Sequence, residues 1–150
     1  MRRVKDQKFG DYFDAFKCIQ AGEPPRRRVV RKDGSVGTKP ICEVPFKTES
    51  DILVECIAWL NKKGLLVNRM NTGAGDFGGG FRTYGIVGGG DIFAIMPPNG
   101  RHLEVECKKS MGGSWSRLQR RRARTVKAVG GIYIVVHGTE ELELKLRKYL

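Results

Sequence analysis

The sequence lacks any long hydrophobic run. No apolar stretch approaches the roughly 18 residues that a membrane-spanning helix needs, and residues 1–16 lack the apolar stretch of a signal peptide. We therefore expect a soluble, intracellular protein with no membrane partner.

Cysteine and histidine are also scarce. Two histidines and four widely spaced cysteines are present, without any C-x-x-C pair: His102, His137, Cys18, Cys42, Cys56 and Cys107. This spacing does not match a zinc-binding pattern and indicates buried thiols instead. Two isolated histidines also argue against a nuclease site built on histidine.

Acidic residues are too few to balance the basic ones. The chain has 28 Lys and Arg against 16 Asp and Glu, which gives a net charge of +12. An excess of this size indicates an acidic partner, and the usual ones are nucleic acids and anionic membrane surfaces. At 150 residues, 40% of them hydrophobic and 20 of them glycine, the chain is long enough for one globular α/β domain.

The first 44 residues differ in composition from the remainder. They contain two basic clusters, Arg2-Arg3 and Arg26–Arg28, a Pro24-Pro25 break and an Asp33-Gly34 turn signal. Aromatic and aliphatic residues recur at helical spacing at Tyr12, Phe13, Phe16 and Ile19. We interpret residues 1–44 as a basic N-terminal arm and residues 45–150 as the main domain.

The main domain alternates helical and strand patterns. A helix is predicted from an N-cap at Thr48, with Asp51 in a capping box and Ile52, Leu53, Cys56, Trp59 and Leu60 on its buried side, to a stop at Gly64. A strand over 65–70 and a glycine-rich segment follow, the latter expected to be loop with a strand around 81–87. Next come a hairpin of strands 91–96 and 101–108, a helix from about Ser114 or Ser116 to Val129, a strand over 132–136 and a C-terminal helix.

The hairpin carries residues suited to catalysis. A period of two places Glu104, Glu106 and Lys108 on one face of the second strand. With a four-residue turn at 97–100, Asp91 lies opposite Glu106, with Cβ atoms about 4.5–5.5 Å apart. A two-residue turn would set Asp91 opposite Lys108, and an odd loop or a bulge would separate them. A solvated acid–lysine pair is the structural alternative, but the acid follows three glycines, Gly88–Gly90, where the backbone would let a phosphate approach.

Two carboxylates and an ammonium group fit phosphodiester hydrolysis. The carboxylates would hold Mg²⁺ through hard oxygen ligands, and the lysine would stabilise the charge that develops on the phosphate. Glu49 lies at the N-terminal end of the buried side of the first helix. It either belongs to this site or complements the helix dipole, and the sequence favours neither role.

A family resemblance rests on the order of these residues: Glu49, Asn71-Thr72-Gly73, Gly90-Asp91, Glu106-x-Lys108 and Gln119. Over about 48–138 this order resembles the VRR-NUC family of PD-(D/E)xK nucleases. The resemblance implies a restriction-endonuclease-like α/β core, with a central mixed β-sheet flanked by helices. Gly90 departs from the family pattern, which often has proline there, and this departure puts the local turn in question.

The resemblance also implies roles for individual residues. Asp91 and Glu106 would bind the metal together with the backbone carbonyl of Cys107, and Glu49 would be a further acid of the metal site. Lys108 would be the catalytic lysine, and Gln119 would border the site. The cofactor would be Mg²⁺, with Mn²⁺ able to substitute.

The helix after the hairpin is strongly basic. Arg117, Arg120, Arg121, Arg124 and Lys127 lie on the side away from Leu118, Val126 and Val129, whereas Gln119 and Arg122 lie nearer the apolar side. We predict that these five residues and Lys109 contact nucleic-acid phosphates. The string from Gly73 to Gly78 matches the dinucleotide pattern GxGxxG, but Gly79 and Gly80 follow it and would not open a helix.

These patterns together predict a magnesium-dependent, structure-selective DNA endonuclease. By resemblance, the substrate would be branched DNA such as a Holliday junction, cut by a homodimer in the cytoplasm of a bacterial or phage-infected host. The alternative is a non-catalytic nucleic-acid-binding module in which the acid–lysine cluster is structural.

Overall fold

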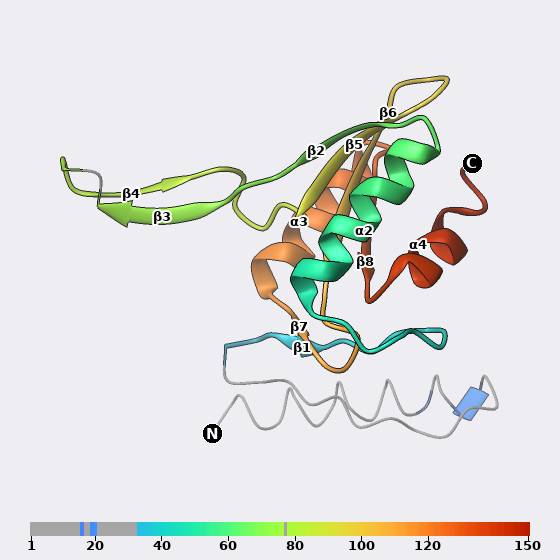
Figure 1. Cartoon of the computed structure of the whole chain (residues 1–150). Helices are drawn as coiled ribbons and strands as arrows, with labels where there is room; N and C mark the ends of the chain where they lie inside the picture. The colour runs from blue at the N-terminus through green and yellow to red at the C-terminus, as the bar shows by residue number, and fades with distance from the viewer. Residues whose placement is uncertain (1–15, 17–18, 21–32, 77) are drawn as a thin grey trace.

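The computed structural model describes residues 16, 19–20, 33–76 and 78–150. It is a mixed α/β structure in which helices flank a mixed four-stranded sheet (Figure 1). The sheet has the order β2 (Leu66–Arg69), β5 (Ile92–Met96), β6 (Arg101–Cys107) and β8 (Ile132–Val136), and only the β6–β8 pair is parallel. The helices are α2 (Glu49–Lys62), α3 (Arg117–Ala128) and α4 (Thr139–Leu146).

The β5–β6 hairpin has the predicted four-residue turn. Met96 pairs with Arg101 across residues 97–100, and Ile92 pairs with Val105. Continuing this register by one residue sets Asp91 opposite Glu106, so the register on which the site depends is confirmed. Gly100 occupies the last turn position with φ of 67°, a left-handed conformation that suits glycine.

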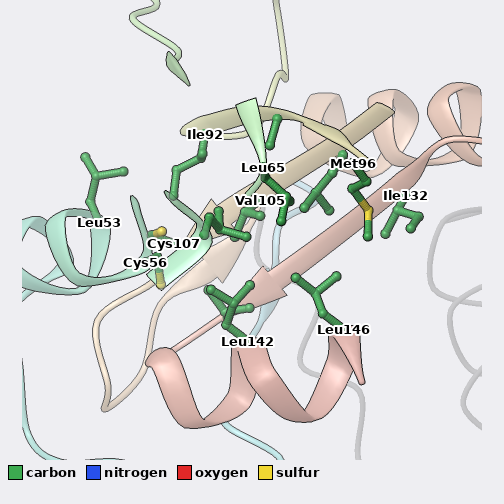
Figure 2. Close-up of a cluster of buried hydrophobic side chains, with 14 of the residues drawn as sticks. Leu53, Cys56, Leu65, Ile92, Met96, Val105, Cys107, Ile132, Leu142 and Leu146 are labelled. Carbon is green, nitrogen blue, oxygen red and sulfur yellow. The ribbon is translucent and has the colours of Figure 1, made fainter. Parts of the chain in front are cut away.

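The main core lies between the sheet and the pair α2 and α4. Alternation along β6 turns Leu103, Val105 and Cys107 into the core, in the same cluster as Ile52. Figure 2 shows Val105 and Cys107 in this cluster together with Leu53 and Leu142. The predicted buried side of α2 is confirmed, with Trp59 partly buried at its margin. Thr48 and Asp51 form the predicted capping box, and α4 confirms the predicted C-terminal helix.

The opposite face of the sheet is covered by α3. Ala123 and Val126 pack there against Tyr133 of β8. Leu118 and Val129, predicted to lie on the apolar side, are 53% and 81% exposed, so that part of the prediction is wrong. Ala123 and Val126 face the sheet instead, together with the polar residues Gln119 and Arg122. The helix begins after Ser116, which caps it.

The glycine-rich segment forms a second hairpin: the strand expected around 81–87 is present over 81–84, whereas the stretch before it is a strand instead of the predicted loop. β3 (Gly73–Asp76) pairs with β4 (Phe81–Tyr84) as a separate two-stranded ribbon that extends away from the main sheet (Figure 1). Asp76 Oδ1 accepts the N–H groups of Gly78 and Gly80 and so closes the tip. The GxGxxG string lies on this ribbon, and no helix opens at Gly78.

Part of the predicted N-terminal arm lies outside the described residues, including both basic clusters and most of the aromatic helical pattern. Within the described range, β1 (Val36–Gly37) pairs with β7 (Ser114–Trp115), just before α3. Among the described helices, none is long and apolar enough to cross a bilayer.

Candidate active site

Asp91 and Glu106 come together because neighbouring antiparallel strands carry them in register. Asp91 directly precedes β5, and its backbone carbonyl accepts the N–H of Met70 at 2.8 Å. Its Oδ2 accepts the N–H of Cys107, also at 2.8 Å. The acid is thus tied to the chain on both sides, and its carboxylate lies against the Glu106–Lys108 segment.

Glu106 is the most enclosed member of the site, at 2% exposure. Its Oε1 accepts Lys108 Nζ at 2.5 Å and Gln119 Nε2 at 2.6 Å. The Tyr133 hydroxyl lies 3.4 Å from Oε2. Three polar side chains, one directly after β6, one from α3 and one from β8, therefore fix the orientation of this carboxylate.

Both acids are harder to ionise than ordinary carboxyl groups. Burial raises the pKa of Glu106 to about 7, the charge of Asp91 adds to this effect, and Lys108 opposes it. Burial also raises the pKa of Asp91, although the Cys107 N–H and Lys108 counteract the rise. Two like charges held close together in a poorly solvated site produce this effect, and a cation would relieve it.

Gln119 links the site to the start of α3. It is the third residue of that helix. Its Oε1 accepts the Ser116 N–H at 2.8 Å, and its own backbone N–H donates to Ser116 Oγ at 3.1 Å. Since Oε1 is engaged in this capping box, Nε2 is directed to Glu106. The placement of the predicted bordering residue thus follows from the helix cap.

Glu49 approaches the same site from the other layer. It is the first residue of α2 and is exposed. Its negative charge contributes to the raised pKa of both Asp91 and Glu106, which places it within electrostatic reach of the pair. It also lies in the first helical turn, so the geometry is compatible with both roles considered from the sequence.

The close packing and the hydrogen bond at position 90 account for glycine, in place of proline, before Asp91. A Cβ on Gly90 would lie 2.8 Å from the backbone oxygen of Val105, which leaves no room for a side chain. Its N–H donates to Glu104 Oε2 at 3.2 Å, a bond that proline could not make. Gly88 likewise packs tightly, since a Cβ there would lie 2.5 Å from the Leu118 carbonyl oxygen. These two glycines serve close backbone packing beside Asp91.

A second polar cluster lies next to the site, and no role was predicted for its members. Glu104 is fully buried, and it accepts Arg122 Nη2 at 2.6 Å and lies 2.8 Å from His102 Nε2. Burial alone would raise the pKa of Glu104, but these bonds outweigh it and lower the pKa. The sequence pattern does contain evidence for this cluster. Strand alternation puts Glu104 on the same face as Glu106, and helical spacing puts Arg122 near the apolar side of the helix.

The carboxylate pair fits a hard divalent cation that retains several waters. Within the described part of the chain, no three His, Cys, Asp or Glu side chains are grouped closely enough to form a metal site by themselves. Mg²⁺, however, is usually bound by one or two carboxylates and keeps water in its other positions. Asp91, Glu106 and the carbonyl of Cys107 are the groups that could hold it, with Glu49 nearby.

The predicted phosphate-binding residues do not share one face of α3. Arg117, Arg120 and Arg124 line a hollow together with Trp115 and Gly34, and Lys127 lines the next hollow along the helix. Arg120 also donates to the Gly34 carbonyl. On the other flank, Arg121 lines a hollow with Val87 and Leu118. Lys109 directly follows Lys108 in the chain and is exposed.

Comparisons with known proteins returned no match: no family model fits the chain, and no curated protein or solved structure is significantly similar to it.

Proposed function

We propose that this protein is a metal-dependent nuclease that hydrolyses phosphodiester bonds in DNA at Asp91, Glu106 and Lys108. The observation that carries the proposal is the pair of enclosed, like-charged carboxylates, with a lysine ammonium 2.5 Å from one of them. A structural ion pair needs one acid for one base. A second acid that raises the pKa of the first is costly for stability and is typical of sites that bind a cation or move protons.

We further propose that the core is restriction-endonuclease-like and that the chain is related to the VRR-NUC nucleases. The order of the elements supports this. An acid precedes β5, a second acid lies near the end of β6 with a lysine directly after that strand, and a glutamine in the first turn of α3 bonds to this second acid. Glu49 at the start of α2 would complete the set.

The side chains have distinct tasks in this proposal. Asp91 and Glu106 would hold Mg²⁺ or Mn²⁺ together with the Cys107 carbonyl. The bound cation would supply Lewis acidity toward a phosphoryl oxygen and lower the pKa of a water ligand. Lys108 keeps three N–H donors, so an ammonium bonded to Glu106 can also donate to a phosphate oxygen and stabilise its developing charge. Gln119 keeps Glu106 oriented while this occurs.

The substrate that we propose is DNA, and specifically a branched form such as a four-way junction cut by a homodimer. The net charge of +12 supports a polyanionic substrate. The preference for branched DNA and the dimer derive from the family resemblance alone. The competing function is a binding module in which the Glu106–Lys108 bond is purely structural, and the 2.5 Å contact is compatible with it.

The decisive experiment compares Asp91→Asn and Lys108→Met with matched controls, Glu143→Gln and Lys62→Met, which alter exposed residues on α4 and α2. Each protein is incubated with labelled linear, flap and four-way-junction DNA in Mg²⁺, Mn²⁺ or EDTA. We expect metal-dependent cleavage by the wild type and both controls. Asp91→Asn and Lys108→Met should bind DNA but not cut it.

Two outcomes would count against the nuclease. DNA binding by the wild type without cleavage on any substrate in either metal would favour the binding module. Cleavage by Asp91→Asn at the wild-type rate would show that the activity resides elsewhere. Circular dichroism of each variant at the assay temperature separates loss of chemistry from loss of fold.

A further inference from the structure

A groove rich in basic residues follows the free edge of the sheet. Its first part is a hollow of about 730 Å³ between the start of β8, the end of α3 and the C-terminal residues after α4. Its charged lining consists of Arg101, Lys127, Lys145, Arg147 and Lys148, and its aromatic lining consists of Tyr133 and Tyr149. Arg101 and Lys148 both lie over the Tyr149 ring, at 5.0 and 4.9 Å from its centre.

The groove continues along α3 through two more hollows. One of about 310 Å³ shares Lys127 and Lys145 with the first and adds Lys39. The next, of about 440 Å³, shares Trp115 with it and adds the arginines of the first turns of α3. No described aspartate or glutamate lines any of the three. We call this continuous surface the basic groove.

The basic groove lies across α3 from the candidate active site. Gln119 and Arg122 of that helix face Glu106 and Glu104, whereas Arg117, Arg124 and Lys127 line the groove. Val87, four residues before Asp91 in the chain, lies with Leu118 on the flank of α3 opposite to the basic groove. The two surfaces therefore lie on different flanks of the helix, and Tyr133 contacts both, because it lines the groove and its hydroxyl lies 3.4 Å from Glu106 Oε2.

A second protein strand is a poor fit for this edge. β8 is the last strand of the sheet, with β6 on one side and no described strand on the other. Lys145 Nζ, however, donates to the Val135 carbonyl at 2.6 Å, and lysines along an edge oppose strand addition. Two copies of this chain paired through the groove would bring like charges together.

We propose that the basic groove binds the sugar-phosphate backbone of a nucleic acid, as a second contact surface distinct from the site at Asp91. Evenly spaced phosphates match a groove lined by cations over its whole length. The inference rests on the proposed function in taking nucleic acid as the ligand, but it does not require cleavage. A ligand bound at the groove and at the Asp91 site together needs one segment on each flank of α3. The arms of a branched nucleic acid provide two such segments.

The test alters Arg147 and Lys148, because both are exposed, line the first hollow and are not among the predicted α3 contacts. Arg101 and Lys145 are avoided since each bonds to a backbone carbonyl. The double variant Arg147→Ala/Lys148→Ala is compared with a control that removes the same charge from α2 and its C-cap, Lys62→Ala/Lys63→Ala.

Binding of fluorescein-labelled four-way-junction DNA and linear duplex DNA is measured by anisotropy in EDTA over a range of salt concentrations. Loss of two phosphate contacts should reduce the slope of log K against log salt by about 1.8 and weaken junction binding severalfold. The control should keep the wild-type slope. Lys127→Ala, at the junction of two hollows, should lower the slope by about 0.9.

Unchanged slopes in both groove variants would overturn the proposal. An equal loss of slope in the α2 control would also overturn it, because it would show that the effect depends on net charge and not on the groove. A change in oligomeric state by light scattering with unchanged DNA binding would assign the groove to subunit contact instead. Because EDTA prevents metal-dependent cleavage, the result is separate from the nuclease test. Cleavage with unchanged slopes would refute only the groove, and groove binding without cleavage would refute only the nuclease.

Discussion

Replacing Glu106 by glutamine tests the energetic cost of the carboxylate pair. Burial and the charge of Asp91 raise the pKa of Glu106 from its usual 4.5 to about 7. Between these values the folded protein retains a proton that the unfolded chain has lost, so its stability should fall as the pH rises from about 4.5 to 7. Glutamine has nearly the same shape and cannot ionise, and it should remove this dependence.

The magnitude follows from the size of the pKa change. A rise from 4.5 to about 7 at 1.36 kcal/mol per pH unit means that ionised Glu106 destabilises the fold by about 3 kcal/mol at pH 8. For a chain of 150 residues this corresponds to roughly 6–12 °C in the midpoint of thermal unfolding. Near pH 4.5 both side chains are neutral, and the two proteins should be similarly stable.

The measurement is thermal or urea unfolding of wild type and Glu106→Gln in EDTA at intervals from pH 4.5 to 8. Subtracting the two profiles removes the contribution of other titrating groups, so the difference should grow with pH and level off above about 7. Saturating Mg²⁺ should recover part of the loss at pH 8 in the wild type but not in the variant, because a ligand of the folded state stabilises it.

Parallel profiles for the two proteins would refute this reasoning, since they would mean that Glu106 ionises as easily in the folded state as in the unfolded state. A stabilisation by Mg²⁺ that persists in Glu106→Gln would instead remove Glu106 from the cation site. The two results are independent, because the first is obtained without metal.

Three further predictions concern the surroundings of the site and the core. Gly90→Ala should lower stability by roughly 1–3 kcal/mol in urea unfolding, because its Cβ would lie 2.8 Å from the Val105 backbone oxygen; an unchanged midpoint would contradict this close packing. Arg122→Met should cost about 3–5 kcal/mol near neutral pH, because it leaves the buried Glu104 charge without its arginine, and unfolding below pH 4 should show a smaller loss. For Glu141, burial would raise the pKa, but hydrogen bonds lower it from 4.5 to about 2. Wild-type stability should therefore fall by about 3 kcal/mol as the pH drops from 4.5 to 2, and Glu141→Gln should lack this acid-dependent loss.

Local sequence patterns predicted helices and strands well where capping residues or residue propensities clearly favoured one of them. Thr48 with Asp51 marked the start of α2, and the helix-forming residues around the C-terminal leucines, whose own spacing was ambiguous, indicated α4 as a helix. They failed in the glycine-rich segment, where β3 forms at Gly73–Asp76 despite poor strand propensity. That strand depends on its partner, since its ladder with β4 supplies the hydrogen bonds that its side chains do not favour.

The sequence by itself determined which face of the β5–β6 hairpin carries the acids and the lysine. Strand alternation is a local property, and a four-residue turn keeps Asp91 opposite Glu106. Only the tertiary structure decided how these groups are enclosed. Gln119 and Tyr133 reach Glu106 from α3 and β8, and their proximity depends on packing between elements distant in the chain. The raised pKa of Glu106, about 7, also depends on tertiary structure, because burial and neighbouring charges are set by packing and not by sequence spacing. Packing around α3 likewise decides which arginines line a hollow on each flank of the helix.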